Sequence, residues 1–159
     1  MRSSNTNAFK SNTCIRFVSI FQSLKSDRLY TKDHEWVVVE DGVAKIGITE
    51  HAQESLGRLV YCKVPAVGDK LGKAEACGAV ESAKAAGDII SPVSGEVLEV
   101  NHAVEDLPQL VNRQPYGEGW MFKVRVEVEE ELGELFDETA YQEYCQLCPH
   151  LANSFLLKC

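Results

Sequence analysis

The chain has 159 residues, 45% of them apolar, which is enough for one compact core and too few for two of ordinary size. Its 16 Lys and Arg residues against 24 Asp and Glu residues give a formal charge of −8, which argues against nucleic acid as a partner. Such a charge should steer the protein toward basic surfaces of other proteins and keep it monomeric.

The first 26 residues differ in composition from the rest. Their charged residues are all basic (Arg2, Lys10, Arg16 and Lys25), and they are rich in Ser, Asn and Thr. This composition is typical of a mitochondrial transit peptide, so we expect residues 1–26 to be removed and the mature protein to act in the mitochondrial matrix. The alternative is a disordered basic terminus without a targeting role. The remaining body has 12 basic and 24 acidic residues, a formal charge of −12.

The apolar stretch at residues 15–21 is interrupted by an arginine and is far too short to cross a bilayer. We therefore expect a soluble protein without a membrane segment. The six cysteines form no disulfide framework. Residues 145–150 read CQLCPH, but a structural zinc site needs a second closely spaced pair of ligands, and the chain has none. No metal site is expected, and Cys62 and Cys77 are interpreted as small buried residues.

The first predicted elements are two strands, at residues 36–39 and 43–48. The Asp-Gly step between them favours a tight β-hairpin. A short helix is predicted near 49–56, with Thr49 as its cap and Gly57 as its end. A further strand follows at 59–64, and the segment 65–69 contains proline and glycine residues that predict a turn.

Short strands are also predicted at 89–90 and 95–100. In the last strand, Phe122, Val124, Val126 and Val128 alternate with polar residues, which indicates one buried and one solvated face. After residue 129 the apolar spacing becomes helical and predicts one or two short helices. Many short strands separated by turns predict a mainly β fold, a flattened barrel or sandwich with a helical C-terminus.

Lys84 stands alone among small residues between two strand-like segments, since residues 81–90 read ESAKAAGDII. A lysine offers a primary amine on a flexible four-carbon stem, and small neighbours leave a modifying enzyme room to reach it. This arrangement predicts an attachment point at the tip of a turn.

Four ordered windows resemble the glycine cleavage system H protein family. The first three are HEWV at 34–37, IGITEHAQ at 46–53 and PYGEGWM at 115–121. The fourth is the lysine segment followed by SPVSGEV at 91–97, which resembles a lipoyl-attachment hairpin. The resemblance covers about residues 28–145 and implies a lipoyl-type fold. It places a carrier domain at 27–145 and leaves 146–159 as a C-terminal extension without a counterpart.

The resemblance implies that lipoate is attached to Lys84 as an amide, on an arm about 14 Å long by covalent dimensions. It also implies a carrier without catalytic residues. Glycine decarboxylase (P protein) loads the arm with an aminomethyl group, the tetrahydrofolate-dependent aminomethyltransferase (T protein) unloads it, and dihydrolipoamide dehydrogenase (L protein) reoxidises it. Lipoyl-attaching enzymes are further implied partners.

The same resemblance places Glu35 and Asp88 near a cleft that receives the loaded arm, where a carboxylate can hold its cationic amine. The alternatives are a solvated carboxylate at a strand edge for Glu35 and an ordinary turn residue for Asp88. His34 and His51 are interpreted as structural or surface residues rather than catalytic ones.

Three other functions remain open at this point. Biotin-accepting domains share the lysine hairpin, but they usually flank the lysine with methionine, whereas the neighbours here are Ala83 and Ala85. A lipoyl relay toward 2-oxoacid dehydrogenases would use the same site for other clients. An unmodified interaction module is the third, if Lys84 is never acylated.

Overall fold

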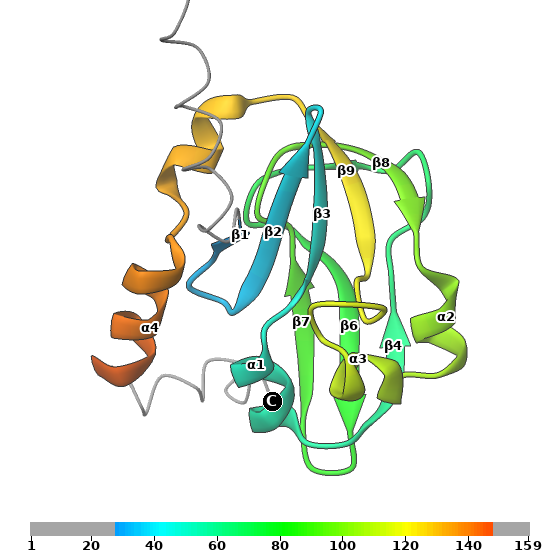
Figure 1. The fold of residues 1–159 in the computed structure, drawn as a ribbon. Helices are drawn as coiled ribbons and strands as arrows, with labels where there is room; N and C mark the ends of the chain where they lie inside the picture. The colour runs from blue at the N-terminus through cyan, green and yellow to red at the C-terminus, as the bar shows by residue number, and fades with distance from the viewer. Residues whose placement is uncertain (1–27, 148–159) are drawn as a thin grey trace, which may run out of the picture.

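The computed structural model describes residues 28–147, which form two antiparallel sheets packed as an open sandwich (Figure 1). The strands are β1 (Arg28–Tyr30), β2 (Glu35–Glu40), β3 (Val43–Ile48), β4 (Leu59–Lys63), β5 (Lys70–Leu71), β6 (Ala76–Ser82), β7 (Ala86–Ile90), β8 (Gly95–Val100) and β9 (Phe122–Val126). The larger sheet has the order β1-β2-β3-β9-β8-β5, and the smaller one has the order β4-β6-β7. The expected mainly β fold is confirmed, in its sandwich form rather than as a closed barrel.

The helices are α1 (Glu50–Leu56), α2 (His102–Asp106), α3 (Gln109–Arg113), the 3₁₀ helix η2 (Glu129–Glu134) and α4 (Glu138–Leu147). The expected helix near 49–56 and the helical C-terminus are confirmed. Four short elements were not expected from the sequence: β1, β5, α2 and α3. With two to five residues each, they are too short for a periodic pattern to reveal. No helix within residues 28–147 has the length and hydropathy needed to cross a membrane.

The β2–β3 hairpin turns at the expected Asp-Gly step. Asp41 and Gly42 have φ angles of 51° and 76°, the left-handed values that a two-residue hairpin loop needs. The chain then enters α1, where the Thr49 hydroxyl accepts a hydrogen bond from the amide of Ala52. Gly57 ends the helix as predicted, and its N–H donates to the carbonyl of Gln53.

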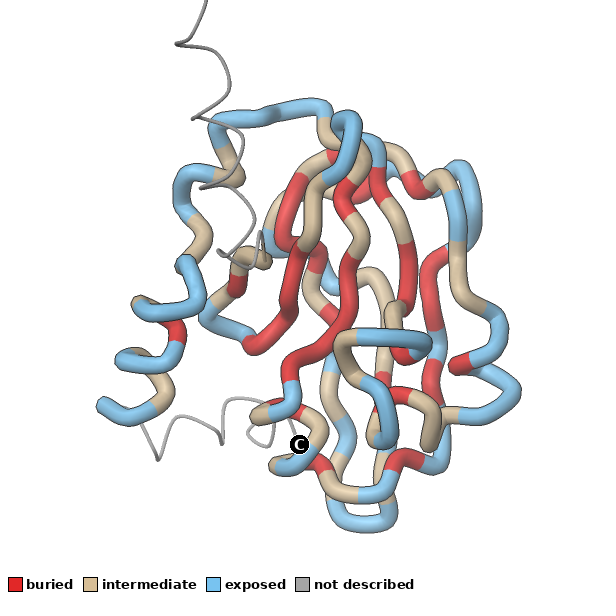
Figure 2. The backbone as a smooth tube through the Cα atoms, in the orientation of Figure 1, coloured by how far each residue is buried: buried red, intermediate tan, exposed pale blue. Residues whose placement is uncertain are grey.

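The main core lies between the sheets and draws on most of the strands (Figure 2). Val37, Ile46, Val80, Ile89 and Val124 are among its fully buried members. Cys62 is buried as expected, whereas Cys77 is only half-buried. One expectation for the last strand is wrong: β9 ends at Val126, and Val128 is 39% exposed because it lies past the strand, where the chain turns into η2.

A second, aromatic cluster joins α4 to the edge of the larger sheet. Tyr30, Trp36 and Tyr141 are buried there, and the rings of Tyr30 and Tyr141 stack with centroids 4.4 Å apart. Tyr30 also exchanges two backbone hydrogen bonds with Phe136, at 2.9 and 2.8 Å. The segment after β9 therefore closes the free edge of β1.

The expected transit peptide at 1–26 lies outside the described residues, as do positions 148–159 of the expected extension. The domain limits remain predictions, although α4 continues through Gln146 and Leu147, two residues beyond the expected end of the carrier domain.

Candidate functional site

Lys84 lies at the tip of the hairpin between β6 and β7, which projects beyond α1 at the lower end of Figure 1. The amide of Ser82 donates to the carbonyl of Ala85 at 2.7 Å and closes the turn. The Ser82 hydroxyl oxygen also accepts from the amides of Lys84 and Ala85, at 3.2 and 3.0 Å. The turn is thus fixed by its own side chain, and Lys84 is exposed as predicted.

The end of α1 lies directly beneath the lysine stem. A Cβ atom built on Gly57 would lie 3.3 Å from Cε of Lys84. Gly57 also has φ 79° and ψ −155°, a conformation that essentially only glycine adopts. The glycine therefore both ends the helix and leaves space for the lysine.

Behind the tip, the hairpin is anchored in the core. Val80 and Ile89 are fully buried, and Gly78 lets the strands pass closely, since a Cβ there would lie 2.4 Å from the carbonyl oxygen of Lys63. The tip itself is exposed and is drawn pale blue in Figure 2. A firm base with an exposed apex suits a lysine that other proteins must find by shape.

Glu35 is fully buried, so the alternative of a solvated strand-edge carboxylate is wrong. Its carboxylate accepts hydrogen bonds from the hydroxyl of Thr31 and from the amide of Ile90, the latter at 3.1 Å. Burial raises the pKa of Glu35 to about 7, although these two hydrogen bonds act in the opposite direction. The carboxyl group is therefore poised to change protonation near neutral pH.

Glu35 lines a cleft of about 230 Å³. The cleft is formed by the β1–β2 turn, the loop after β5, the end of β7 and the segment 134–136. Its wall contains Lys32, Asp33, Lys73 and Glu134 besides Glu35, together with apolar groups such as Pro92 and Phe136. A cleft with apolar walls and a few carboxylates suits a small cationic group.

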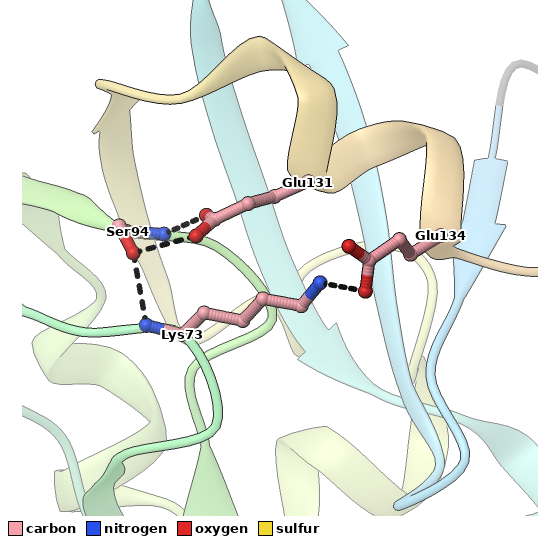
Figure 3. A network of polar contacts seen from close by, with 4 residues as sticks. All are labelled: Lys73, Ser94, Glu131 and Glu134. Carbon is pink, nitrogen blue, oxygen red and sulfur yellow. Dashed lines mark hydrogen bonds and ion pairs between the residues drawn. The ribbon is translucent and has the colours of Figure 1, made fainter.

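A polar network holds the outer wall of this cleft in place (Figure 3). The ammonium group of Lys73 pairs with the carboxylate of Glu134. Glu131 accepts from both the amide and the hydroxyl of Ser94, at 2.6 and 2.9 Å. These contacts tie η2 to the β5–β6 loop and to the β7–β8 loop, so the C-terminal segment forms part of the site.

Asp88 lies inside strand β7 opposite Ala79 and is exposed, so it is not a turn residue. It lies between Lys84 and Ile90 in the chain but does not line the cleft of Glu35. Glu35 thus contacts the lysine-bearing hairpin through the amide of Ile90. Asp88, on the strand between Lys84 and Ile90, is exposed on the outer surface.

Sequence reasoning missed Thr31, Lys73 and Glu134. All three lie outside the recognised windows. Lys73 and Glu134 approach Glu35 only through the fold, whereas Thr31 lies just before it in the chain. His34, by contrast, is buried and structural: its Nδ1 lies 2.7 Å from the hydroxyl of Tyr141. Burial lowers the pKa of His34 to about 4.

An open β sandwich that presents one lysine at a rigid hairpin tip, with a carboxylate-lined cleft further along the same hairpin, defines a carrier of a covalently attached group. The comparisons agree with this class. A family model described as "Glycine cleavage H-protein" matches residues 28–147, and the chain belongs to that family.

The glycine cleavage system H protein of Thermotoga maritima is 52% identical over 116 residues, which cover 73% of this chain and 94% of that protein. A Thermus thermophilus protein of the same name is 48% identical over 120 residues, covering 76% of this chain and 94% of that protein. A crystal structure of a glycine cleavage system H protein from Mycobacterium marinum superposes with a TM-score of 0.69 at 40% identity, covering 77% of this chain and 97% of that one.

Proposed function

We propose that this chain is the lipoyl-carrying component of a glycine cleavage system, with lipoate on Lys84. The observation that carries the proposal is the exposed ε-amine at the stapled tip of the β6–β7 hairpin, in a chain that belongs to the H-protein family. The protein is a carried substrate and not an enzyme. It presents the attached group to other active sites and contributes no catalytic residue.

The residues around Lys84 fit such a modification. The stem lies over a glycine, and Ala83 and Ala85 beside it are small, so an attaching enzyme meets little obstruction. When bound, lipoate supplies a dithiolane that takes up the aminomethyl group of glycine together with two electrons. The protein itself has to present and orient the attached group and to keep water away from its loaded end.

Glu35 and its cleft are proposed to hold the amine of the one-carbon unit. Ile90, whose amide binds Glu35, lies six residues beyond Lys84, at most about 20 Å along an extended strand. An arm of about 14 Å is about 6 Å shorter than this upper limit, so we propose that only its loaded end approaches the carboxylate. An arriving ammonium group would favour the ionised form of Glu35, which burial otherwise opposes. Asp88, exposed on the way, is proposed as a secondary contact.

The proposed partners are the P, T and L proteins and the lipoyl-attaching enzymes. A formal charge of −8 in a chain of this size supports brief, steered encounters with basic surfaces, as a carrier with several clients needs. We also propose that the protein acts in the mitochondrial matrix. The relatives described above are not mitochondrial proteins, so this part depends only on the basic, acid-free composition of residues 1–26.

The proposal is tested by intact-mass measurement and peptide mapping of protein isolated from its own cells, where one lipoyl group on Lys84 is expected. In a reconstituted system, Lys84→Arg should abolish both lipoylation and glycine cleavage without changing the melting temperature, because the tip is exposed. The matched control is Lys63→Arg, an exposed lysine on β4 of the same sheet, which should keep both. An unmodified Lys84 in cells that make lipoate, or full activity of Lys84→Arg, would refute the proposal.

A lipoyl relay to 2-oxoacid dehydrogenases would use the same lysine. It is distinguished from a glycine cleavage carrier by the enzymes that depend on it. Loss of lipoylation on those dehydrogenases after removal of this chain, with glycine cleavage intact, would favour the relay.

A further inference from the structure

Three possible metal ligands come together under the C-terminal helix. His34, in the turn before β2, His51, in the first turn of α1, and Cys145, on α4, have ligand atoms that all lie within 4.8 Å of one another. It is the one group of three or more such side chains found among residues 28–147. The three residues are far apart in the sequence. The β2–β3 hairpin brings the rings of His34 and His51 to 4.7 Å between centroids, and α4, packed against β1, adds Cys145.

We propose that His34, His51 and Cys145 bind a single late first-row cation of the Zn²⁺ type. Two imidazoles and one thiolate are ligands that such ions prefer, and three protein ligands leave a fourth position for water or an external group. The site is separate from Lys84 and from the Glu35 cleft, whose walls include none of these three residues.

The spacing is close to what an ion requires. Ligand atoms bound to one tetrahedral zinc ion lie about 3.3–3.8 Å apart, given bonds of about 2.0–2.3 Å. Starting from 4.8 Å or less, closing the site takes movements of about 1 Å. His51 and Cys145 are half-buried, so their side chains have room for movements of this size. An ion can reach the site from the solvent.

The surroundings orient the buried ligand. The Tyr141 hydroxyl lies 2.7 Å from Nδ1 of His34 and 2.8 Å from Oγ1 of Thr49, and it also interacts with the Cys145 side chain. The proposal therefore assigns Nε2 of His34 to the ion and keeps Nδ1 for Tyr141. An outer partner that fixes the second ring nitrogen is the usual support of a metal-bound histidine.

An ion at this place would join three elements. His34 precedes β2, His51 lies in the first turn of α1, and Cys145 belongs to α4, which packs against β1. The metal would lock α4 onto the body, and because η2 and Glu134 lie on the same C-terminal segment, it would also steady the wall of the Glu35 cleft.

The test uses the full chain with Lys84→Arg, so that no dithiol on the arm can chelate metal. Titration with Co²⁺ under reducing conditions should give one equivalent of binding, with a sulfur-to-cobalt charge-transfer band and the visible bands of a tetrahedral ion. Cys145→Ser should abolish the charge-transfer band, and His51→Ala should weaken binding by about tenfold or more. The matched control Cys77→Ser, another half-buried thiol, should bind as the parent does.

The segment following Cys145 offers competing ligands, since Cys148 and His150 lie three and five residues further on. Cys148→Ser is therefore included and should bind as the parent does. A second readout is thermal: Zn²⁺ should raise the melting temperature of the parent and not that of Cys145→Ser, whose metal-free melting temperature should match the parent's. The proposal is overturned if the parent gives no charge-transfer band, if Cys145→Ser keeps it, or if Cys148→Ser loses it.

Discussion

At the scale of single residues, the two proposed functional groups have opposite environments. Lys84 is exposed and stands at a turn held by the Ser82 hydroxyl, so its chemistry is that of an accessible amine. Glu35 is fully buried and held by Thr31 and Ile90, so its chemistry is set by desolvation. Lys84 must be accessible to other proteins, whereas Glu35 must be protected from water. Strand β7 connects the two sites.

The raised pKa of Glu35 predicts how stability depends on pH. Because the folded protein holds this proton up to about pH 7 while the unfolded chain releases it near its ordinary value, stability should fall as pH rises through that window. Glu35→Gln lacks the effect and should become more stable than the parent at pH 8, by up to about 3 kcal/mol, with little difference at pH 4. Denaturant unfolding of both proteins at several pH values measures this.

The comparison with the glutamine variant also removes the contribution of His34. The lowered pKa of His34 acts in the opposite direction, since its unfolded form binds more protons and stability rises with pH. That contribution is common to both proteins. Parallel pH profiles would show that Glu35 carries no ionisation penalty in the folded protein.

Gly57 has two roles: it adopts a backbone conformation that ends α1, and it leaves space for Lys84. We expect Gly57→Ala to impair both. Its conformation should cost about 1–3 kcal/mol of stability, and the added methyl group should crowd the stem of Lys84 and slow lipoylation. Gly68→Ala is the matched control: Gly68 has φ 90°, but nothing lies within 4 Å of its Cβ position. It should lose stability and keep the rate of lipoylation. Equal rates for the two variants would refute the steric role of Gly57.

At the scale of elements, α4 is held by a polar contact inside an aromatic cluster. The Tyr141 hydroxyl meets both His34 and Thr49, and Thr49 in turn caps α1, so three elements share one oxygen atom. A buried hydroxyl with two partners is costly to remove because both partners lose a bond away from water.

Tyr141→Phe should therefore lower the free energy of unfolding by about 1–3 kcal/mol. Tyr61→Phe, on β4, is the control: this side chain is 46% exposed, and loss of its hydroxyl should cost about 0.5 kcal/mol or less. Chemical denaturation of the two variants gives the comparison. An equally small loss in both would mean that the hydroxyl contacts of Tyr141 do not hold the helix.

At the scale of the whole molecule, the sandwich core and the C-terminal segment are separable. The fully buried members of the main core all precede residue 128, whereas η2 and α4 cover the edge of β1 and one wall of the cleft. A chain ending at Val128 should still fold, with a lower melting temperature.

Truncation at Val128 should also open the Glu35 cleft, since Glu134, Leu135 and Phe136 leave its wall. With water readmitted, the pKa of Glu35 should fall toward its ordinary value, and the loss of stability between about pH 5 and pH 8 should shrink. Unfolding measured at these two pH values in both lengths of chain tests the prediction. If the pH dependence is unchanged in the shorter chain, burial by the C-terminal segment is not the cause of the raised pKa of Glu35.

Features that depend on local chemistry could be predicted from the amino-acid sequence. The Asp-Gly hairpin, the Thr49 cap and Gly57 end of α1, and the lone lysine between short strands each follow from a few adjacent residues, and the structure confirms them. The mainly β class followed from the same kind of evidence, because turns and strand alternation are short-range signals.

Contacts between distant residues could be seen only in the folded chain. Burial of Glu35, the approach of Lys73 and Glu134 to its cleft, and the grouping of His34, His51 and Cys145 depend on contacts between segments far apart in the chain. The same holds for Val128, whose alternating position suggested burial although the strand ends before it. Side-chain alternation reports a local period, whereas burial depends on what the folded chain places opposite each side chain.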